Sequence, residues 1–358
     1  MGRPYLPLKF LSMDAPQSPG ITEALANLSV IWILAIVAGL TVLRLGLIRV
    51  PTPAARSTSE ILESGIIAIV LVFLIIRPFV VQAYYIPSPS MEPTLLGKQG
   101  SGDRILVNKF DYRLSHPHHD DVVVFLAPKE TGWENSDFIK RLIGVPGDRI
   151  QVVGGQIVIN GKIYKHADVR QALVVAGECG DAARQEAQSG LQDDLQADYH
   201  VKFVPEGVRV SDNAGHTKLV SKARLAEILA GPGYPVTVRP GVVIRNGQTL
   251  DEPFIAEDPD YDMQIYQGEP LKHDYNPPMP NLEYRGNVGG TEDGISQPQY
   301  QREAAQPTQP IPPGKYLMMG DNRNDSNDST NWGLLDAKRV VGKAQIVFWP
   351  PSRVGLIH

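Results

Sequence analysis

The chain has 358 residues, enough for one large or two ordinary domains beside membrane segments. Its formal net charge of -5 provides no basic surface for nucleic acid, so no nucleic-acid partner is expected. The single cysteine, Cys179, excludes an intrachain disulfide, and we expect it to be a small, exposed side chain in a loop. The 33 glycines and 30 prolines favour turns and strands over a helical bundle.

Two apolar stretches follow an N-terminal tail of residues 1–24. They cover about residues 25–48 and 61–84, and each is close to the ~20 residues that cross a ~30 Å hydrocarbon layer as a helix. A cleaved secretory signal is the alternative for the first stretch. Its apolar core is too long for that, and no small-residue cleavage pattern follows. We therefore expect two transmembrane helices within residues 25–84.

The connector between these stretches predicts their orientation. Residues 44–59 contain Arg44, Arg49 and Arg56 and no acid, whereas the N-terminal tail mixes basic and acidic residues. Cytoplasmic loops carry an excess of lysine and arginine. The connector is therefore expected in the cytoplasm, with both termini and everything after residue 84 on the extracytoplasmic side of the cell membrane.

The pattern changes to short β-strands after residue 85. Residues 104–108, 122–125, 149–153 and 156–159 are rich in β-branched side chains and are bounded by Gly, Pro and Asp. Asn160-Gly161 then supplies the positive φ angles of a hairpin turn. Residues 85–164 are thus expected to be the first part of a β domain.

A similar strand followed by Asn-Gly occurs at residues 241–247. An insertion of residues 165–237 that split or duplicated one hairpin explains the recurrence; chance similarity of two common hairpins is the alternative. The insertion contains a helix signal at residues 221–230, with a serine start, apolar spacing of 3.6 residues and Gly231 as a stop.

The β domain is expected to resume over residues 238–350 and to end in a tail of residues 351–358. Within it, residues 262–313 are rich in Pro, Gln, Gly and Asn and indicate a polar loop region. Strands return at residues 315–319 and 342–349. The expected fold is mainly β: two N-terminal helices, then an antiparallel all-β domain with a smaller α+β insertion.

Four short segments carry candidate chemistry: residues 84–95, containing Ser88 and Ser90; residues 138–148, containing Lys140; and the runs 320–323 and 326–329. A serine hydroxyl is a poor nucleophile until a base takes its proton. None of the eight histidines lies in a triad motif, and there is no G-x-S-x-G elbow. A lysine amine kept neutral by desolvation is the other possible base. Lys140 fits this role because it lies in an apolar run beside the like charge of Arg141.

Together, these four segments resemble the motif set of the bacterial type I signal peptidase (leader peptidase) family. The resemblance covers about residues 60–165 and 238–350. It implies that Ser90 is the nucleophile and Lys140 the general base. It also implies an oxyanion hole formed by the Ser88 hydroxyl and the Ser90 backbone N–H, with Ser326 orienting the lysine amine.

The resemblance further implies a supporting polar network and an apolar substrate pocket. Asp321, Arg323 and Asp328 would form the network, with Asp328 in a salt bridge. The pocket would be lined by Ile86, Pro87, Met91, Leu95 and Ile139. The chain departs from the family pattern at Pro89, often glycine, in the order Asn324-Asp325, and at Thr330, where arginine is common. The last departure argues against an arginine partner for Asp328 at that position.

Two acidic or histidine-rich clusters are better explained as polar loops than as metal sites. His118, His119, Asp120 and Asp121 are consecutive and cannot all face one point on a strand. The spacing of Asp258, Asp260, Asp262 and Glu269 is similar to that of a calcium loop, but Met263 replaces the required glycine. We therefore expect no metal and no cofactor.

The expected function is that of a membrane-anchored serine endopeptidase with a Ser–Lys dyad. It would remove signal peptides from exported preproteins by cleaving after small residues at -1 and -3, with membrane lipid as its surroundings. One alternative is a specialised peptidase for a narrow substrate such as a pilin or conjugation protein. Another is a catalytically silent membrane scaffold whose residues 165–237 bind a partner. Every assigned catalytic residue lies outside the insertion, so it is expected to be dispensable for the chemical step.

Overall fold

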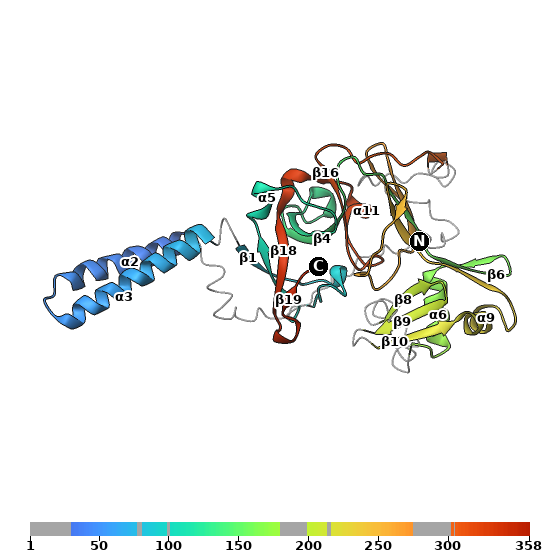
Figure 1. Ribbon diagram of the computed structural model, residues 1–358, viewed down its shortest axis with the longest axis horizontal. Coiled ribbons are helices and arrows are strands. Elements are labelled where there is room, and N and C mark those ends of the chain that lie inside the picture. Colours follow the sequence, from blue (N-terminus) through green and yellow to red (C-terminus); the bar gives the residue numbers. More distant parts are fainter. Residues whose placement is uncertain are drawn as a thin grey trace, which may run out of the picture. The chain divides into compact units, whose positions relative to one another are not determined.

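The computed structural model describes residues 30–76, 81–98, 101–179, 199–212, 216–274, 302–303 and 305–358. The chain divides into two compact units, residues 1–80 and 81–358. Figure 1 shows a helical first unit and a second unit made mainly of strands. The predicted N-terminal tail, residues 1–24, lies outside the described residues.

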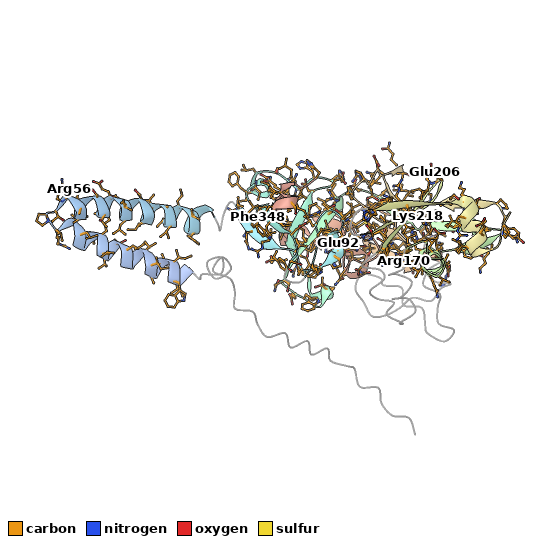
Figure 2. All side chains as sticks on the ribbon, turned by 90° about the horizontal axis from the view of Figure 1, so that it is seen from below. Arg56, Glu92, Arg170, Glu206, Lys218 and Phe348 are labelled. Carbon is orange, nitrogen blue, oxygen red and sulfur yellow. The ribbon has the colours of Figure 1, made fainter. Side chains whose placement is uncertain are left out.

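The first unit is a helical hairpin. Helix α2 (Val30–Ile48) is followed by α3 (Pro53–Val70) and a π-helical turn, η1 (Leu71–Ile76). Thr52 starts α3 because its hydroxyl accepts a hydrogen bond from the amide of Ala55 and Pro53 occupies the first helical position. Arg44 and Glu63 join the two helices by an ion pair of 2.5 Å. Figure 2 places Arg56 near the turn between them.

The prediction of two transmembrane helices is not confirmed. Among the described residues one helix, Ile31–Ile48, is long and apolar enough to cross a membrane, with a mean hydropathy of 2.3. The second predicted stretch does not form a single helix over residues 61–84. Its helix begins earlier, at Pro53, and therefore includes Arg56 and Glu60; the far end of the stretch enters strand β1 (Val81–Tyr85).

The second unit contains the large sheet that carries the candidate site. Its strands lie in the order β1, β2 (Arg104–Asn108), β18 (Val340–Trp349), β3 (Val122–Leu126), β4 (Asp137–Gly144), β16 (Lys315–Met319) and β17 (Leu335–Asp336). The short strand β19 (Gly355–Leu356) pairs with β18. Neighbouring strands are antiparallel, as predicted. Apolar residues of β2, β3 and β18 pack under the segment that follows β1.

A second antiparallel sheet has the order β13 (Gln248–Thr249), β12 (Val242–Arg245), β5 (Ile150–Val153), β14 (Tyr261–Tyr266) and β15 (Glu269–Asp274). The hairpin β14–β15 corrects the predicted polar loop of residues 262–313, because the first part of that region forms regular strands. Gln267 and Gly268 connect them with φ angles of 49° and 85°. Residues 275–301 and 304 of the region lie outside the described residues.

The described residues between 156 and 239 form an α+β module around a core of their own. A three-stranded sheet has β6 (Gln156–Ile159) between β7 (Lys162–Tyr164) and β11 (Val236–Arg239). A second sheet contains β8 (Tyr199–Val204), β9 (Gly207–Asp212) and β10 (Thr217–Ser221). Helices α6 (His166–Val175) and α9 (Lys222–Leu229) lie beside these strands (Figure 1).

The described core of this module crosses the predicted boundaries of the insertion. Ile157, Ile159 and Val238, from outside residues 165–237, pack with residues of α6, β8, β9 and α9. Cys179 is also buried there, so its predicted exposure is wrong. We call residues 165–237 the middle segment below.

Both predicted Asn-Gly hairpins are confirmed. Asn160 and Gly161 join β6 to β7 with φ angles of 50° and 78°, and Asn246 and Gly247 join β12 to β13 with 55° and 81°. Positive φ at both central residues is the geometry that asparagine and glycine adopt most readily. Ser221 likewise caps α9 at the predicted place, accepting a hydrogen bond from the amide of Arg224.

Candidate active site

Ser90 lies in a short 3-10 turn, η2 (Pro89–Met91), just after strand β1. Its hydroxyl oxygen accepts a hydrogen bond of 2.7 Å from the amine of Lys140. Its carbonyl oxygen accepts one of 3.2 Å from the amide of Asn322. The neighbouring Met91 is fully buried. The proposed nucleophile is therefore fixed by contacts on three sides.

Lys140 is brought to Ser90 by strand β4, although the two residues are 50 positions apart. The side chain is buried, and its amine also donates a hydrogen bond of 3.0 Å to the carbonyl of Ile139. Burial lowers the pKa of Lys140 to about 8, against the opposing influence of Asp328, Asp321 and Asp325. A neutral amine is thus available near neutral pH.

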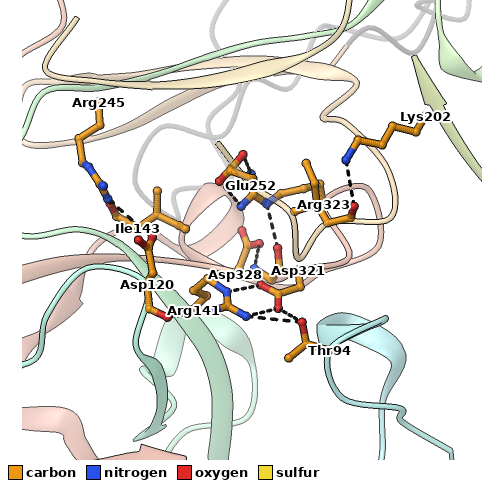
Figure 3. Close-up of polar contacts among 12 residues, drawn as sticks. Thr94, Asp120, Arg141, Ile143, Lys202, Arg245, Glu252, Asp321, Arg323 and Asp328 are labelled. Atoms are coloured by element: carbon orange, nitrogen blue, oxygen red, sulfur yellow. Dashed lines mark hydrogen bonds and ion pairs between the residues drawn. The ribbon is translucent and has the colours of Figure 1, made fainter. Parts of the chain in front are cut away.

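Arg141, the next residue of β4, faces the opposite side of the strand, as successive strand residues do. It is fully buried and forms two hydrogen bonds to Asp321, of 2.8 and 2.7 Å. Its guanidinium also lies 3.9 Å from the ring centre of Phe254. Figure 3 shows Arg141 and Asp321 facing one another beside Thr94. Arg141 is therefore the ion-pair partner of Asp321.

Ser88 is the second serine of the motif. Its side chain is exposed, and its hydroxyl oxygen lies 3.3 Å from that of Ser90. The structure thus brings the two predicted serines together, with Ser88 on the exposed side and Ser90 on the side that contacts Lys140. The role of the Ser88 hydroxyl as an oxyanion donor stays a prediction.

Gly320 packs against Ser90 and Ser326. A Cβ atom at Gly320 would lie 2.3 Å from the hydroxyl oxygen of Ser326 and 2.4 Å from the carbonyl oxygen of Ser90, so only glycine fits. The Ser326 hydroxyl is buried and has no hydrogen-bond partner within the described residues. The described hydrogen bonds of the Lys140 amine go to Ser90 and Ile139 instead. The orienting role of Ser326 stays a prediction.

Asp328 organises the loop after Gly320 without a salt bridge among the described residues. It caps the short helix α11 (Ser329–Trp332) and accepts hydrogen bonds from the Thr330 amide (3.0 Å) and hydroxyl (2.7 Å). Its other oxygen accepts from the amide of Gly320 at 2.9 Å. Thr330, at a position where arginine is common, therefore supplies a neutral donor in place of the expected ionic partner.

Arg323 is also buried, and it pairs with Glu252, a residue that the sequence did not assign to the site. Two hydrogen bonds of 2.8 and 2.6 Å join the guanidinium to the Glu252 carboxylate, and a third, of 3.0 Å, reaches the carbonyl of Gly320. Glu252, Pro253 and Phe254 follow shortly after the second Asn-Gly hairpin of the sequence. The ring of Phe254 lies against Arg141, so this short segment supports both buried arginines.

The predicted pocket residues divide into two groups. Ile86, Met91 and Leu95 are buried in one apolar cluster with residues of β2, β3 and β18. Ile139 is partly buried against that cluster, and Pro87 is exposed. The cluster therefore forms the floor beneath the Ser90 segment, and Ile139 and Pro87 border its surface.

Two further acids, Glu257 and Asp258, connect the middle segment to the site loop. Asp258 was expected in a polar loop but is buried; it accepts hydrogen bonds from His166 at 2.9 Å and from the Phe203 amide at 2.7 Å. Glu257, also buried, pairs with Arg170 at 2.7 Å and accepts from Asn324 at 3.0 Å. No pattern in the sequence indicated these contacts, because acids are ordinarily exposed.

The histidine–aspartate run after residue 117 forms ordinary hydrogen bonds. Asp121 accepts from the hydroxyl of Tyr112 and pairs with Lys343, and His119 contacts Asp148 at 2.6 Å. Within the described ranges, no group of three histidine, cysteine, aspartate or glutamate residues could hold a metal ion.

Comparison with known proteins identifies the family to which this arrangement belongs. The family described as "Signal peptidase, peptidase S26" matches residues 58–211 and 222–349, which is most of the chain. The chain belongs to the signal peptidase family. Most of the middle segment falls inside the matched ranges. Its prediction as an insertion is not tested by this match.

Several bacterial signal peptidases are similar over most of their length. A signal peptidase I of Aquifex aeolicus is 29% identical over 291 residues, covering 78% of this chain and 80% of that protein. A probable signal peptidase I-2 of Synechocystis is 24% identical over 308 residues (86% and 80%). A signal peptidase IB of Staphylococcus aureus is 26% identical over 296 residues (82% and 92%). This signal peptidase is accordingly a serine protease that cleaves signal peptides.

Proposed function

We propose that this signal peptidase is a membrane-anchored endopeptidase that acts by a Ser90–Lys140 dyad. The observation that carries the proposal is the 2.7 Å contact between the Lys140 amine and the Ser90 hydroxyl, in a place where burial lowers the lysine pKa to about 8. Of the alternatives, a silent scaffold would have no reason to keep a buried lysine against a serine, because burying an ammonium group is unfavourable.

The reaction proceeds through an acyl-enzyme. Neutral Lys140 takes the proton of the Ser90 hydroxyl as its oxygen attacks the scissile carbonyl. The Ser88 hydroxyl and the Ser90 backbone N–H donate hydrogen bonds to the resulting oxyanion. The lysine ammonium then protonates the leaving amine of the mature protein. Water, deprotonated by Lys140, attacks the ester and releases the signal peptide and free Ser90.

The substrate binds as an added strand. Strand β1 pairs with β2 along one edge and is the first strand of the large sheet, so its other edge has no partner strand among the described residues. An extended peptide on that edge presents alternate residues to the enzyme, which places -1 and -3 on the same side. The apolar cluster of Ile86, Met91 and Leu95, with Ile139 and Pro87 at its border, limits those residues to small side chains.

Membrane anchoring rests on the helical hairpin. Helix α2 has the length and hydropathy of a membrane span, and its ion pair between Arg44 and Glu63 ties α3 to it. The three arginines near the turn favour a cytoplasmic connector. We infer a two-pass anchor in the cell membrane, with the catalytic unit on the extracytoplasmic side.

Purified full-length protein in detergent, incubated with a panel of preproteins, tests the proposed function. The new N-termini should follow small residues at -1 and -3, and replacing the -1 alanine by phenylalanine should abolish cleavage. Ser90→Ala, Lys140→Ala and Lys140→Arg should be inactive yet folded, the last because a guanidinium remains protonated.

The exposed Lys129→Ala variant is the matched control and should retain full activity. Near-wild-type turnover in a Ser90 or Lys140 variant would exclude the dyad. Cleavage of a single preprotein in the panel would favour the specialised peptidase instead. A wild-type protein that cleaves nothing would favour the silent scaffold.

A further inference from the structure

A cavity of about 430 Å³ lies between the nucleophile segment and the middle segment. Glu92, Pro93 and Leu96, which lie shortly after Ser90 in the sequence, line one side. Residues of β8 and β9 line another side. Pro253, Ile255 and Ala256, from the loop that supports the buried arginines, and Arg353 complete it. The middle segment therefore contributes a wall to a cavity that begins two residues from the proposed nucleophile.

Two cations from the middle segment face this cavity. Lys202 in β8 lies directly opposite Arg209 in β9, and both line the cavity. Like charges directly opposite one another on neighbouring strands are destabilising. Neither side chain forms a salt bridge within the described residues; the Lys202 amine donates to the carbonyl of Ile255 at 3.1 Å (Figure 3). Burial lowers the pKa of Lys202, and the nearby Arg209 lowers it further against the charge of Asp258.

The other charged residues of the cavity have partners of their own. Arg353 is neutralised by Asp103 at 3.0 Å. Asp212 pairs with His216 at 2.9 Å, and His200 lies 3.9 Å from the buried Glu257.

Glu92, on the opposite wall, accepts a hydrogen bond of 3.2 Å from the amide of Gly97. Burial raises the pKa of this carboxyl above its ordinary value. Among the described residues that line the cavity, Lys202 and Arg209 are the cations without a carboxylate partner.

We propose that this cavity binds an acidic side chain of the substrate polypeptide, a few residues from the scissile bond. The inference rests on the proposed function and adds a specificity element to it. Consecutive Cα atoms are about 3.8 Å apart, so a chain held at Ser90 reaches the level of Glu92 within two or three residues. A carboxylate between Lys202 and Arg209 separates the two like charges and forms a charge-assisted hydrogen bond with each.

A substrate series tests this assignment. One model preprotein that the wild type cleaves is made with Asp, Asn or Lys at each of six positions on either side of the scissile bond, leaving -1 and -3 unchanged. Asp should be preferred over Asn by about fivefold in kcat/KM at one or two positions, the size expected for a partly exposed ion pair. Arg209→Ala and Lys202→Ala should remove that preference and leave cleavage of the Asn substrate unchanged.

Two further variants sharpen the result. Arg209→Glu should reverse the preference toward Lys at the same position. Lys222→Ala removes a cation from an exposed position of the same segment outside the cavity and should change nothing. Absence of an Asp preference at every position, or an undiminished preference in Arg209→Ala, would overturn the proposal. So would equal losses on Asp and Asn substrates, which would mean that the cations only support the fold. Failure of the proposed function would give a different result, because the wild type would then cleave no substrate in the series.

Discussion

Lys140 and Arg141 are adjacent cations whose surroundings make them chemically different. Both are buried, but Arg141 has the carboxylate of Asp321 as a direct partner. The described hydrogen bonds of Lys140 go only to neutral oxygens, those of Ser90 and Ile139. A guanidinium holds its proton under all usable conditions, and an amine does not. The strand thus keeps one permanent charge paired and presents one amine that can lose its proton.

The buried amine predicts a specific dependence of stability on pH. The pKa of Lys140 is lowered from 10.5 to about 8 in the folded chain, so between these values the unfolded chain binds more protons. Stability therefore rises with pH across that window, and below it the buried charge is unfavourable by on the order of 3 kcal/mol. Lys140→Met should unfold at higher denaturant than wild type at pH 7, with the difference vanishing above pH 10.5.

Urea unfolding of both proteins across that pH range measures the effect. The exposed Lys129→Met serves as control, since an exposed lysine should show no such dependence. In parallel, the kcat/KM of the wild type should rise with pH and level off above about 8, as the amine becomes neutral. A rate that falls through this range would contradict the role of Lys140 as base.

Ser88 provides a second test at the residue scale. Its hydroxyl lies 3.3 Å from that of Ser90 but does not contact the Lys140 amine in the described hydrogen bonds. Ser88→Ala should lower kcat by about 10²–10³-fold with little change in KM, the loss typical of one oxyanion donor. Ser88→Thr retains the hydroxyl and should recover part of the rate. Equal rates for Ser88→Ala and wild type would place the oxyanion hole elsewhere.

At this scale the sequence predicted the contacts that depend on motif residues and missed those that depend on buried acids. The contact of Ser90 with Lys140 follows from the motifs, despite their separation of 50 residues. Glu252 and Asp258 could not be placed in the same way. Acids are usually exposed, and their partners here lie 71 and 92 residues away in the chain.

At the scale of elements, the loop from Gly320 to Asp328 depends on segments that it does not adjoin in sequence. Its Arg323 is buried and held by Glu252. Glu252→Ala leaves that arginine buried without its carboxylate, and the loss of one partner of a buried pair costs about 3–5 kcal/mol. We expect a drop of that size in the free energy of unfolding, measured by urea denaturation, together with loss of cleavage.

Two related variants distinguish the ion pair from simple loss of volume. Glu252→Gln keeps the shape and one acceptor oxygen, so it should be destabilised less than Glu252→Ala. The double variant Glu252→Leu with Arg323→Met removes both charges and should recover stability relative to Glu252→Ala. A Glu252→Ala protein as stable as wild type would show that Arg323 finds another partner.

Helices and strands were predicted correctly where the sequence carries a strong local pattern, such as a β-branched run, a turn motif or a helix cap. Strands with runs of β-branched residues and Asn-Gly turns were predicted within a residue or two, such as β6 and β12. Hairpin β14–β15 was missed because its strands carry Asp262 and Glu269 and its turn is Gln267-Gly268. Helix α6 was missed because Lys165 precedes it in place of Ser, Thr, Asp or Asn.

At the scale of the whole catalytic unit, the middle segment is built into the structure. The sequence favoured a dispensable insertion. The contacts argue against this: replacing residues 165–237 by a Gly-Ser link exposes Ile157, Ile159 and Val238 and removes His166 and Arg170. Two buried carboxylates then lose their cationic partners, at several kcal/mol each. We expect this variant to be insoluble or unfolded and inactive, as measured by circular dichroism and preprotein cleavage.

A single substitution in the middle segment provides the control for this deletion. Val175, at the end of α6, is 64% exposed, so Val175→Ala should leave both folding and cleavage unchanged. If the shortened chain proved folded and active, residues 165–237 would be an appendage after all.

The buried carboxylates of Glu257 and Asp258 predict which residues should vary together among members of the family. They are stable in this chain because His166, Arg170 and two backbone amides of β8 lie against them. A relative that lost the stretch carrying those donors would retain two desolvated anions and would lose them by selection. Across homologues, acids at these two positions should therefore be gained and lost together with a cationic helix like α6. An alignment in which they vary independently would contradict this.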